Sequence, residues 1–169
     1  DTSEYKDDWV DITDKVEWQH TYKVVERDYP TGYYKANDFV FAVNTKNNIT
    51  ITMTDPTIKA RFRKYDTSGN VLDGKFEFKV IQKDNGKTVD VIDLTKADAK
   101  GYVYFGDTLL EGTTYQIIET DAARGYNLAK GYVEFTTPSY YGGTNEVNKG
   151  CVIRSGDNTQ SCVAWEDIY

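Results

Sequence analysis

The sequence has little of what most enzymes and membrane proteins depend on: one histidine, two cysteines, one methionine and three prolines among 169 residues. The single histidine, His20, has no serine or cysteine partner in a recognisable motif, so we do not expect a catalytic triad. Because metal sites are usually built from several histidine or cysteine side chains close together, we expect neither a metal nor another cofactor.

Long apolar runs and basic runs are also lacking. No stretch approaches the roughly 20 apolar residues of a membrane span, so we expect no insertion into a membrane. The net charge is −7, which argues against a nucleic-acid partner. The sequence has no recognisable signal peptide or anchoring tail, and we expect any such signal to lie outside this fragment.

Aromatic and β-branched residues are abundant, with 14 tyrosines and 7 phenylalanines. From Thr57 onward, short alternating runs are separated by turn signals, which is typical of an all-β, immunoglobulin-like sandwich. No window sustains an apolar helical stripe of ten or more residues. The predicted strands lie around Ile58–Lys64 and 76–80, and at 89–94, 102–105, 115–119, 132–135, 151–154 and 162–168.

An internal repeat divides the chain. Residues 21–33 match residues 114–126 without a gap, with Thr, Tyr, Glu, Asp, Gly and Tyr in common, and 51–55 resembles 163–167. Chance similarity between two β-hairpins is the alternative. The repeat predicts tandem domains, an incomplete one at 1–56 and a second one at 57–169 with an extended C-terminal hairpin.

Three charged residues continue core-facing strand patterns. Side chains two apart share a face of a strand, so the alternating apolar sets lead to Lys64, to Glu119 and to Asp167. Isolated buried charges cost several kcal/mol each, so such groups normally pair or become neutral. The alternation therefore predicts one amine and two acids in the same apolar interior.

These residues would allow spontaneous amide formation. Burial disfavours the charged forms, which favours a neutral amine on Lys64 and a protonated acid on Asp167. Glu119 would polarise the acceptor carbonyl and move protons while water leaves. A partly solvated salt bridge at a strand end is the alternative.

Four segments resemble the Cna-B (SpaA-like) domains of Gram-positive surface adhesins and pilins. They are Lys64-Tyr65-Asp66 and residues 74–78, 94–105 and 110–120, in the order and spacing of that family. The resemblance covers about residues 57–135. It implies a prealbumin-like sandwich and an isopeptide bond from Lys64 to Asp167, with Glu119 as the catalytic acid.

The last strand departs from the family pattern, because Asp167 is not followed by the usual proline. Asn145, Asn148 and Asn158 therefore remain alternative acceptors. In the first copy, the resemblance places Glu26 at the catalytic position and Asp55 at the acceptor position. Its lysine would fall before residue 1, so we expect the front of that domain to be missing from this chain or replaced by another strand.

Cys151 and Cys162 flank a turn-forming segment, residues 155–160. Cross-strand cysteines at matching positions form disulfides in oxidising compartments, and we predict a disulfide between them, with free thiols as the alternative.

These observations predict an extracellular structural or adhesive protein, anchored to a cell wall or associated with a pilus, and not a turnover enzyme. Its expected partners are a host or neighbouring-cell surface ligand, or other subunits of a pilus or adhesin. The alternative is a carbohydrate- or protein-binding module without an isopeptide bond, which would bind through residues 136–150. A conventional hydrolase is disfavoured because no nucleophile–base pair is recognisable.

Overall fold

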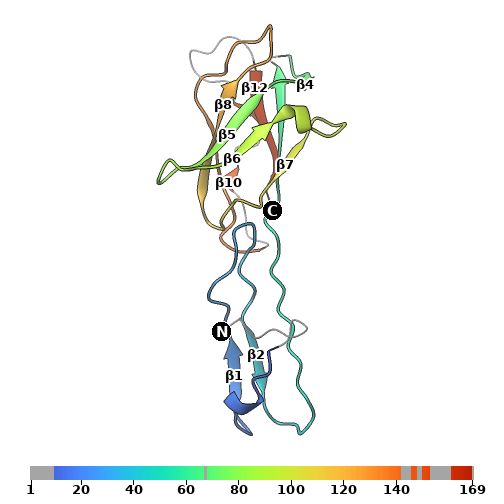
Figure 1. Ribbon diagram of the computed structural model, residues 1–169, viewed down its shortest axis with the longest axis vertical. Helices are drawn as coiled ribbons and strands as arrows, with labels where there is room; N and C mark the ends of the chain where they lie inside the picture. The colour runs from blue at the N-terminus through green and yellow to red at the C-terminus, as the bar shows by residue number, and fades with distance from the viewer. Residues whose placement is uncertain (1–9, 67, 142–145, 148–149, 153–160, 169) are drawn as a thin grey trace. The chain divides into compact units, whose positions relative to one another are not determined.

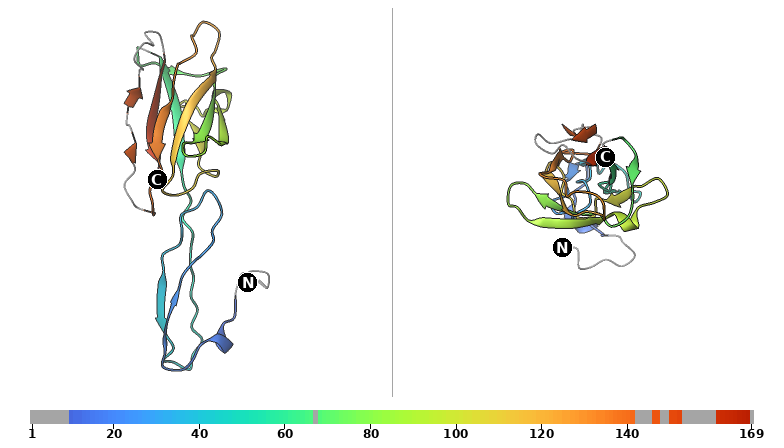
Figure 2. Two further views of the ribbon diagram at one scale, coloured as in Figure 1. Left: turned by 90° about the vertical axis from the view of Figure 1, so that its left-hand side faces the viewer. Right: turned by 90° about the horizontal axis from the view of Figure 1, so that it is seen from above.

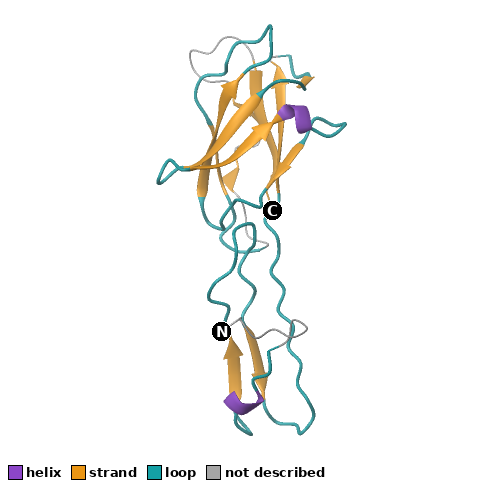
Figure 3. Cartoon of the chain, in the orientation of Figure 1, coloured by secondary structure: helices purple, strands orange, loops and turns teal. Residues whose placement is uncertain are grey.

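The structure is a computed structural model that describes residues 10–66, 68–141, 146–147, 150–152 and 161–168. The chain divides into two compact units. The first unit comprises Asp1–Asp28 and Ala36–Thr54, and the second comprises Tyr29–Lys35 and Asp55–Tyr169. Within the described ranges, the helical turns are two short 3₁₀ helices and the rest is strand or loop (Figure 3). The prediction of an all-β fold is confirmed.

In its described residues, the first unit contains one antiparallel pair of strands. After the 3₁₀ turn η1 (Thr13–Lys15), strand β1 (Thr21–Val24) pairs with β2 (Phe39–Ala42) (Figure 1). Tyr22 stands directly opposite Phe41, and their rings stack with centroids 5.7 Å apart. Aromatic cross-strand pairs of this kind are what stabilises a two-stranded sheet.

The second unit is a sandwich of two antiparallel sheets, which appear as two layers in Figure 2. One sheet has the order β10-β9-β8-β5-β6, and the other has the order β11-β12-β3-β4, with β7 also paired to β3. The elements of this unit are β3 (Ala60–Asp66), β4 (Val71–Leu72), β5 (Glu77–Gln82), β6 (Thr88–Asp93), η2 (Leu94–Lys96), β7 (Val103–Phe105), β8 (Thr114–Asp121), β9 (Val133–Thr136), β10 (Glu146–Val147), β11 (Gly150–Val152) and β12 (Ser161–Ile168).

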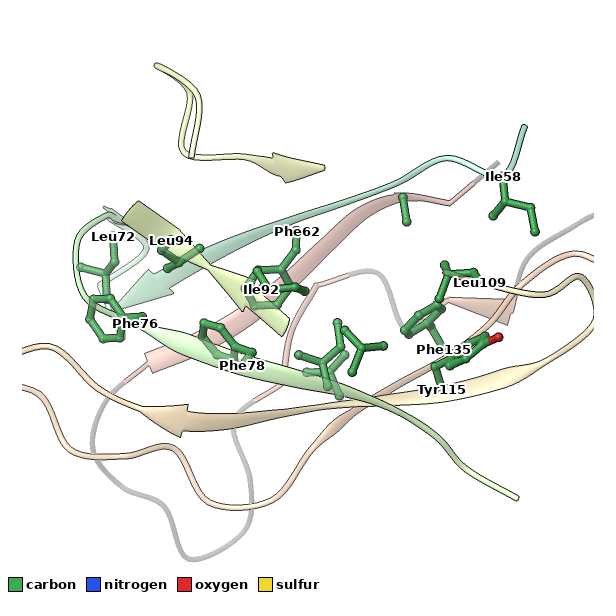
Figure 4. Close-up of a cluster of buried hydrophobic side chains, with 14 of the residues drawn as sticks. Ile58, Phe62, Leu72, Phe76, Phe78, Ile92, Leu94, Leu109, Tyr115 and Phe135 are labelled. Atoms are coloured by element: carbon green, nitrogen blue, oxygen red, sulfur yellow. The ribbon is translucent and has the colours of Figure 1, made fainter. Parts of the chain in front are cut away.

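The core lies between these sheets. Alternation buries every second residue of β3 and β8, and the same pattern brings Phe62 of β3 against Phe78 of β5, with ring centroids 4.7 Å apart (Figure 4). Side chains from both sheets and their loops complete it: Tyr34, Ile58, Ala60, Leu72, Phe76, Val80, Ile92, Leu94, Leu109, Tyr115, Ile117, Val133 and Phe135. Lys64 and Glu119 are set in this apolar layer, so the packing of the core also builds the site.

Two fully buried tyrosines of the second unit differ in how their hydroxyls are satisfied. Tyr115 Oη accepts a hydrogen bond from the Leu110 N–H at 2.8 Å. Tyr34 Oη has no hydrogen-bond partner among the described residues, and its burial, with the charge of Glu111 nearby, raises its pKa to about 12. A buried polar group without a partner costs about 1–3 kcal/mol.

This contrast predicts different effects of the same substitution at the two tyrosines. Tyr115→Phe should lower the free energy of unfolding by about 1 kcal/mol because it removes a hydrogen bond. Tyr34→Phe should leave the free energy of unfolding unchanged or raise it by up to about 1 kcal/mol. Urea unfolding of both variants measures the difference, and equal losses would contradict this account of Tyr34.

Candidate functional site

The candidate site begins with Lys64, a lysine of β3 whose side chain is 0 % exposed. Ala60, Phe62 and Lys64 alternate with less buried residues and so share the inward face of β3. The Lys64 Nζ lies 4.9 Å from the ring centre of Phe76 and 5.3 Å from that of Phe78. Aromatic faces attract a cation but do not replace its hydration shell, so the amine still needs a polar partner.

Glu119 of β8 provides that partner. Its Oε1 lies 2.6 Å from Lys64 Nζ, and both side chains are almost fully buried. The other carboxylate oxygen, Oε2, accepts a hydrogen bond from the backbone N–H of Ala129. One oxygen is thus fixed by the backbone while the other faces the amine, which orients the carboxyl group toward Lys64.

Burying an ion pair of this kind has a high electrostatic cost. Removing two charges from water costs several kcal/mol per ion, and only good geometry with further hydrogen bonds recovers that loss. Passing the proton from Lys64 Nζ to Glu119 Oε1 converts the ion pair into an amine and a carboxylic acid, with no net charge to bury. The same geometry therefore allows a nucleophilic amine beside a group that can give and take protons.

Asp66, the third residue of the Lys64-Tyr65-Asp66 motif, has a structural role at the end of β3. Its Oδ1 accepts hydrogen bonds from the N–H groups of Ser68 and Asn70, and its Oδ2 accepts one from Asn70 Nδ2. These hydrogen bonds, those from Asn70 first, hold the pKa of Asp66 below its ordinary value. The motif therefore combines an inward lysine with the residue that fixes the following turn.

The proposed acceptor, Asp167, lies on β12, which pairs with β3. Val163 stands opposite Lys64 and Trp165 opposite Phe62, but a bulge between Trp165 and Asp167 shifts the register by one. Asp167 consequently pairs with Arg61, three residues and so about 10 Å along β3 from Lys64. The backbone pairing does not bring Asp167 opposite Lys64, and its side chain lies outside what the structure describes. Asp167 as acceptor stays a prediction.

Several other predicted residues are not brought together by the described structure. The alternatives Asn145, Asn148 and Asn158 lie outside the described residues. Strand β11 pairs with β12 in an antiparallel register that places Cys151 opposite Ala164 and not opposite Cys162. The structure does not describe the side chains of the two cysteines, so the disulfide stays a prediction.

The first-copy residues fall in different units, Glu26 in the first and Asp55 in the second. Glu26 Oε2 accepts a hydrogen bond from the N–H of Ala36 at 2.7 Å. The roles predicted for Glu26 and Asp55 in cross-linking stay predictions.

Alternation found Lys64 and Glu119 but missed the group that orients the acid. The Ala129 N–H comes from a loop, where there is no strand alternation to follow, and an alanine side chain gives no indication that its backbone N–H binds an acid. A signal was nevertheless present in the repeat: Ala129 follows Glu119 by ten positions, and Ala36 follows Glu26 by ten.

Comparison with known proteins gives one positive result. A family model described as SpaA, a prealbumin-like fold domain, matches residues 59–149, which is more than half of the chain. This match includes Lys64 and Glu119 and ends before β12. Neither the curated proteins nor the solved structures gave a significant match.

Proposed function

Because the chain belongs to the SpaA family of prealbumin-like fold domains, we propose that it is a structural module of a Gram-positive surface pilin or adhesin. We further propose that an isopeptide bond formed by Lys64 locks its second unit. The observation that carries the proposal is the contact of 2.6 Å between the buried Lys64 Nζ and Glu119 Oε1. An ordinary structural lysine would be at the surface, where its ammonium group stays hydrated.

The bond-forming step uses each group once. Lys64 passes a proton to Glu119, and the resulting amine attacks the side-chain carbonyl carbon of an Asp or Asn acceptor, for which Asp167 is the first candidate. A C–N bond forms and the C–O bond of a protonated Asp breaks, so that one water leaves. Glu119 gives its proton to the departing hydroxyl and takes one from the new amide nitrogen. The products are a neutral amide and a protonated Glu119, and no buried charge remains.

This reaction happens once per molecule, so the cross-linking itself is not turnover catalysis. A bond from Lys64 to Asp167 would close a loop of about 100 residues, which by the arithmetic of disulfides is worth about 4–5 kcal/mol. It would also join β3 to β12, so that a pulling force could not separate these two strands by breaking hydrogen bonds alone. A pilus or adhesin stalk under tension requires this property.

The proposed location is the outside of a Gram-positive cell, where domains of this family occur in pilins. No helix within the described ranges has the length and apolarity needed to cross a membrane. The proposed partners are other pilus or adhesin subunits, or a surface ligand on a host or neighbouring cell.

The identity of the acceptor can be tested by changing its leaving group. If Asp167 is the acceptor, the unaltered chain should be one water lighter than its sequence, and Asp167→Asn should instead be one ammonia lighter than its own sequence. Asp167→Ala should have its full sequence mass. The cross-linked forms of the unaltered chain and of Asp167→Asn contain the same amide and have the same absolute mass, so the mass of the reduced intact protein is compared with each chain's own sequence mass. A deficit that stays the same in Asp167→Ala would exclude Asp167, and a deficit of one ammonia in the unaltered chain would point to an Asn.

A further inference from the structure

The first unit repeats the strand pair of the second unit that carries Glu119. In the first unit, Tyr22 of β1 stacks on Phe41 of β2 with centroids 5.7 Å apart, and in the second unit Tyr115 of β8 stacks on Phe135 of β9 with centroids 5.4 Å apart. Each tyrosine stands directly opposite its phenylalanine in the register. The sequence repeat is therefore also a repeat of cross-strand packing.

The acid is repeated with its backbone contact. Four residues after the stacked tyrosine, Glu26 accepts the N–H of Ala36, as Glu119 accepts the N–H of Ala129. In the second unit, the other oxygen of the carboxylate binds Lys64. In the described part of the first unit, no lysine or arginine forms an ion pair with Glu26. The described part of the first unit thus has the oriented acid without an amine beside it.

The two copies differ in what covers this face. Tyr115, Ile117 and Glu119 are buried beneath the second sheet, in which β3 lies. The residues at the same positions in the first unit, Tyr22, Val24 and Glu26, are only half-buried. The described part of that unit has one sheet, formed by β1 and β2, and a sheet of two strands is only marginally stable in water.

An open groove accompanies the uncovered face. It has a volume of about 530 Å³, and its apolar lining includes Phe41, the stacking partner of Tyr22, with Val43, Ile49 and Ile51. These apolar side chains would be covered in a complete sandwich, and they are what the inward residues of an added strand would contact.

We propose that the first unit is an acceptor for an extended polypeptide strand in which apolar residues alternate and lead, in the same phase, to a lysine. The strand would lay its apolar residues in the groove and place its lysine against Glu26. The second unit contains the model for this occupant, because Ile58, Ala60 and Phe62 lead to Lys64 in the same way and meet Glu119. The binding requires no covalent bond in either unit.

The test uses the full chain and a labelled synthetic peptide with the sequence of residues 57–66, beside the same peptide with methionine in place of Lys64. We expect the lysine peptide to bind at least tenfold more tightly than the methionine peptide, because the methionine peptide would cover the Glu26 carboxylate without giving it a charged partner. Glu26→Gln should remove that preference, since the amide still accepts the Ala36 N–H but carries no charge. Glu17→Gln is the matched control, because Glu17 is an exposed acid of the same unit, and it should keep the preference.

Three results would overturn the proposal. They are no binding of either peptide, equal binding of both peptides, and a lysine preference that survives Glu26→Gln. Sedimentation of the chain alone supplies a fourth. If the chain self-associates, Glu26→Gln leaves that association unchanged, and the associated chain binds neither peptide, the groove is covered by a second copy and not by a lysine-bearing strand. None of these readouts depends on the mass of the second unit, so failure here leaves the isopeptide proposal separately testable.

Discussion

Lys64→Met is expected to abolish the cross-link and to yield a chain with its full sequence mass and a much lower melting temperature. Methionine fills a similar volume beside Phe76 and Phe78 but offers no nitrogen. Loss of the closed loop alone removes about 4–5 kcal/mol. For a unit of this size, that corresponds to a fall in melting temperature of roughly 10–20 °C.

Stability alone does not distinguish a covalent bond from an ion pair at this position. Removing one partner of a buried salt bridge also costs about 3–5 kcal/mol, because the other charge is left without compensation. Mass does distinguish them, since only the covalent bond changes it. Lys83→Met is the matched control: Lys83 forms an exposed pair with Glu134 at 2.9 Å, so its loss should change stability by less than about 1 kcal/mol and leave the mass deficit intact. A deficit that persists in Lys64→Met would mean that Lys64 is not the donor.

Glu119→Gln is expected to prevent formation of the isopeptide bond although the Lys64 amine and the acceptor side chain are both still present. Glutamine has nearly the shape of glutamate and its carbonyl can accept the Ala129 N–H, but it cannot take a proton from Lys64. The variant should therefore keep its full sequence mass and unfold at a lower temperature. Thermal unfolding and reduced intact mass, measured on the same sample, give both quantities, and Glu119→Ala should show the same absence of a deficit.

The control for the acid is Glu134→Gln on the neighbouring strand β9. Glu134 is a partly exposed acid that accepts hydrogen bonds from Gln116 and Lys83, and these lower its pKa. Its replacement should keep the mass deficit, because it lies outside the buried site. If the deficit survives in Glu119→Gln, another group moves the protons and Glu119 has only a positioning role.

Most of the fold could be predicted because strand alternation is a local property. Core residues such as Phe62 and Phe78 are apolar and occupy alternate positions of their strands, so the core can be predicted by taking every second residue of each strand. The same counting placed Lys64 and Glu119 in the interior, and the structure brings their side chains together at 2.6 Å. Short strands such as β4 and β10, each of two residues, have too few positions to show alternation and were not predicted.

The rest of the site depends on features that strand alternation does not predict. The Ala129 N–H is placed by a loop, whose path is set by tertiary packing. Phase is also lost at a β-bulge, since one extra residue exchanges the two faces of a strand. The bulge between Trp165 and Asp167 is such a place, and Asp167 pairs there with Arg61 although Val163 pairs with Lys64.

The most direct test of the central claim is the mass of the intact, unaltered chain after reduction of any disulfide. Formation of the bond from Lys64 to Asp167 predicts a mass one water below that of the sequence, and a digest should then contain one branched peptide that joins β3 to the C-terminal segment. A mass equal to that of the sequence would contradict the account and leave Lys64 and Glu119 as a buried ion pair.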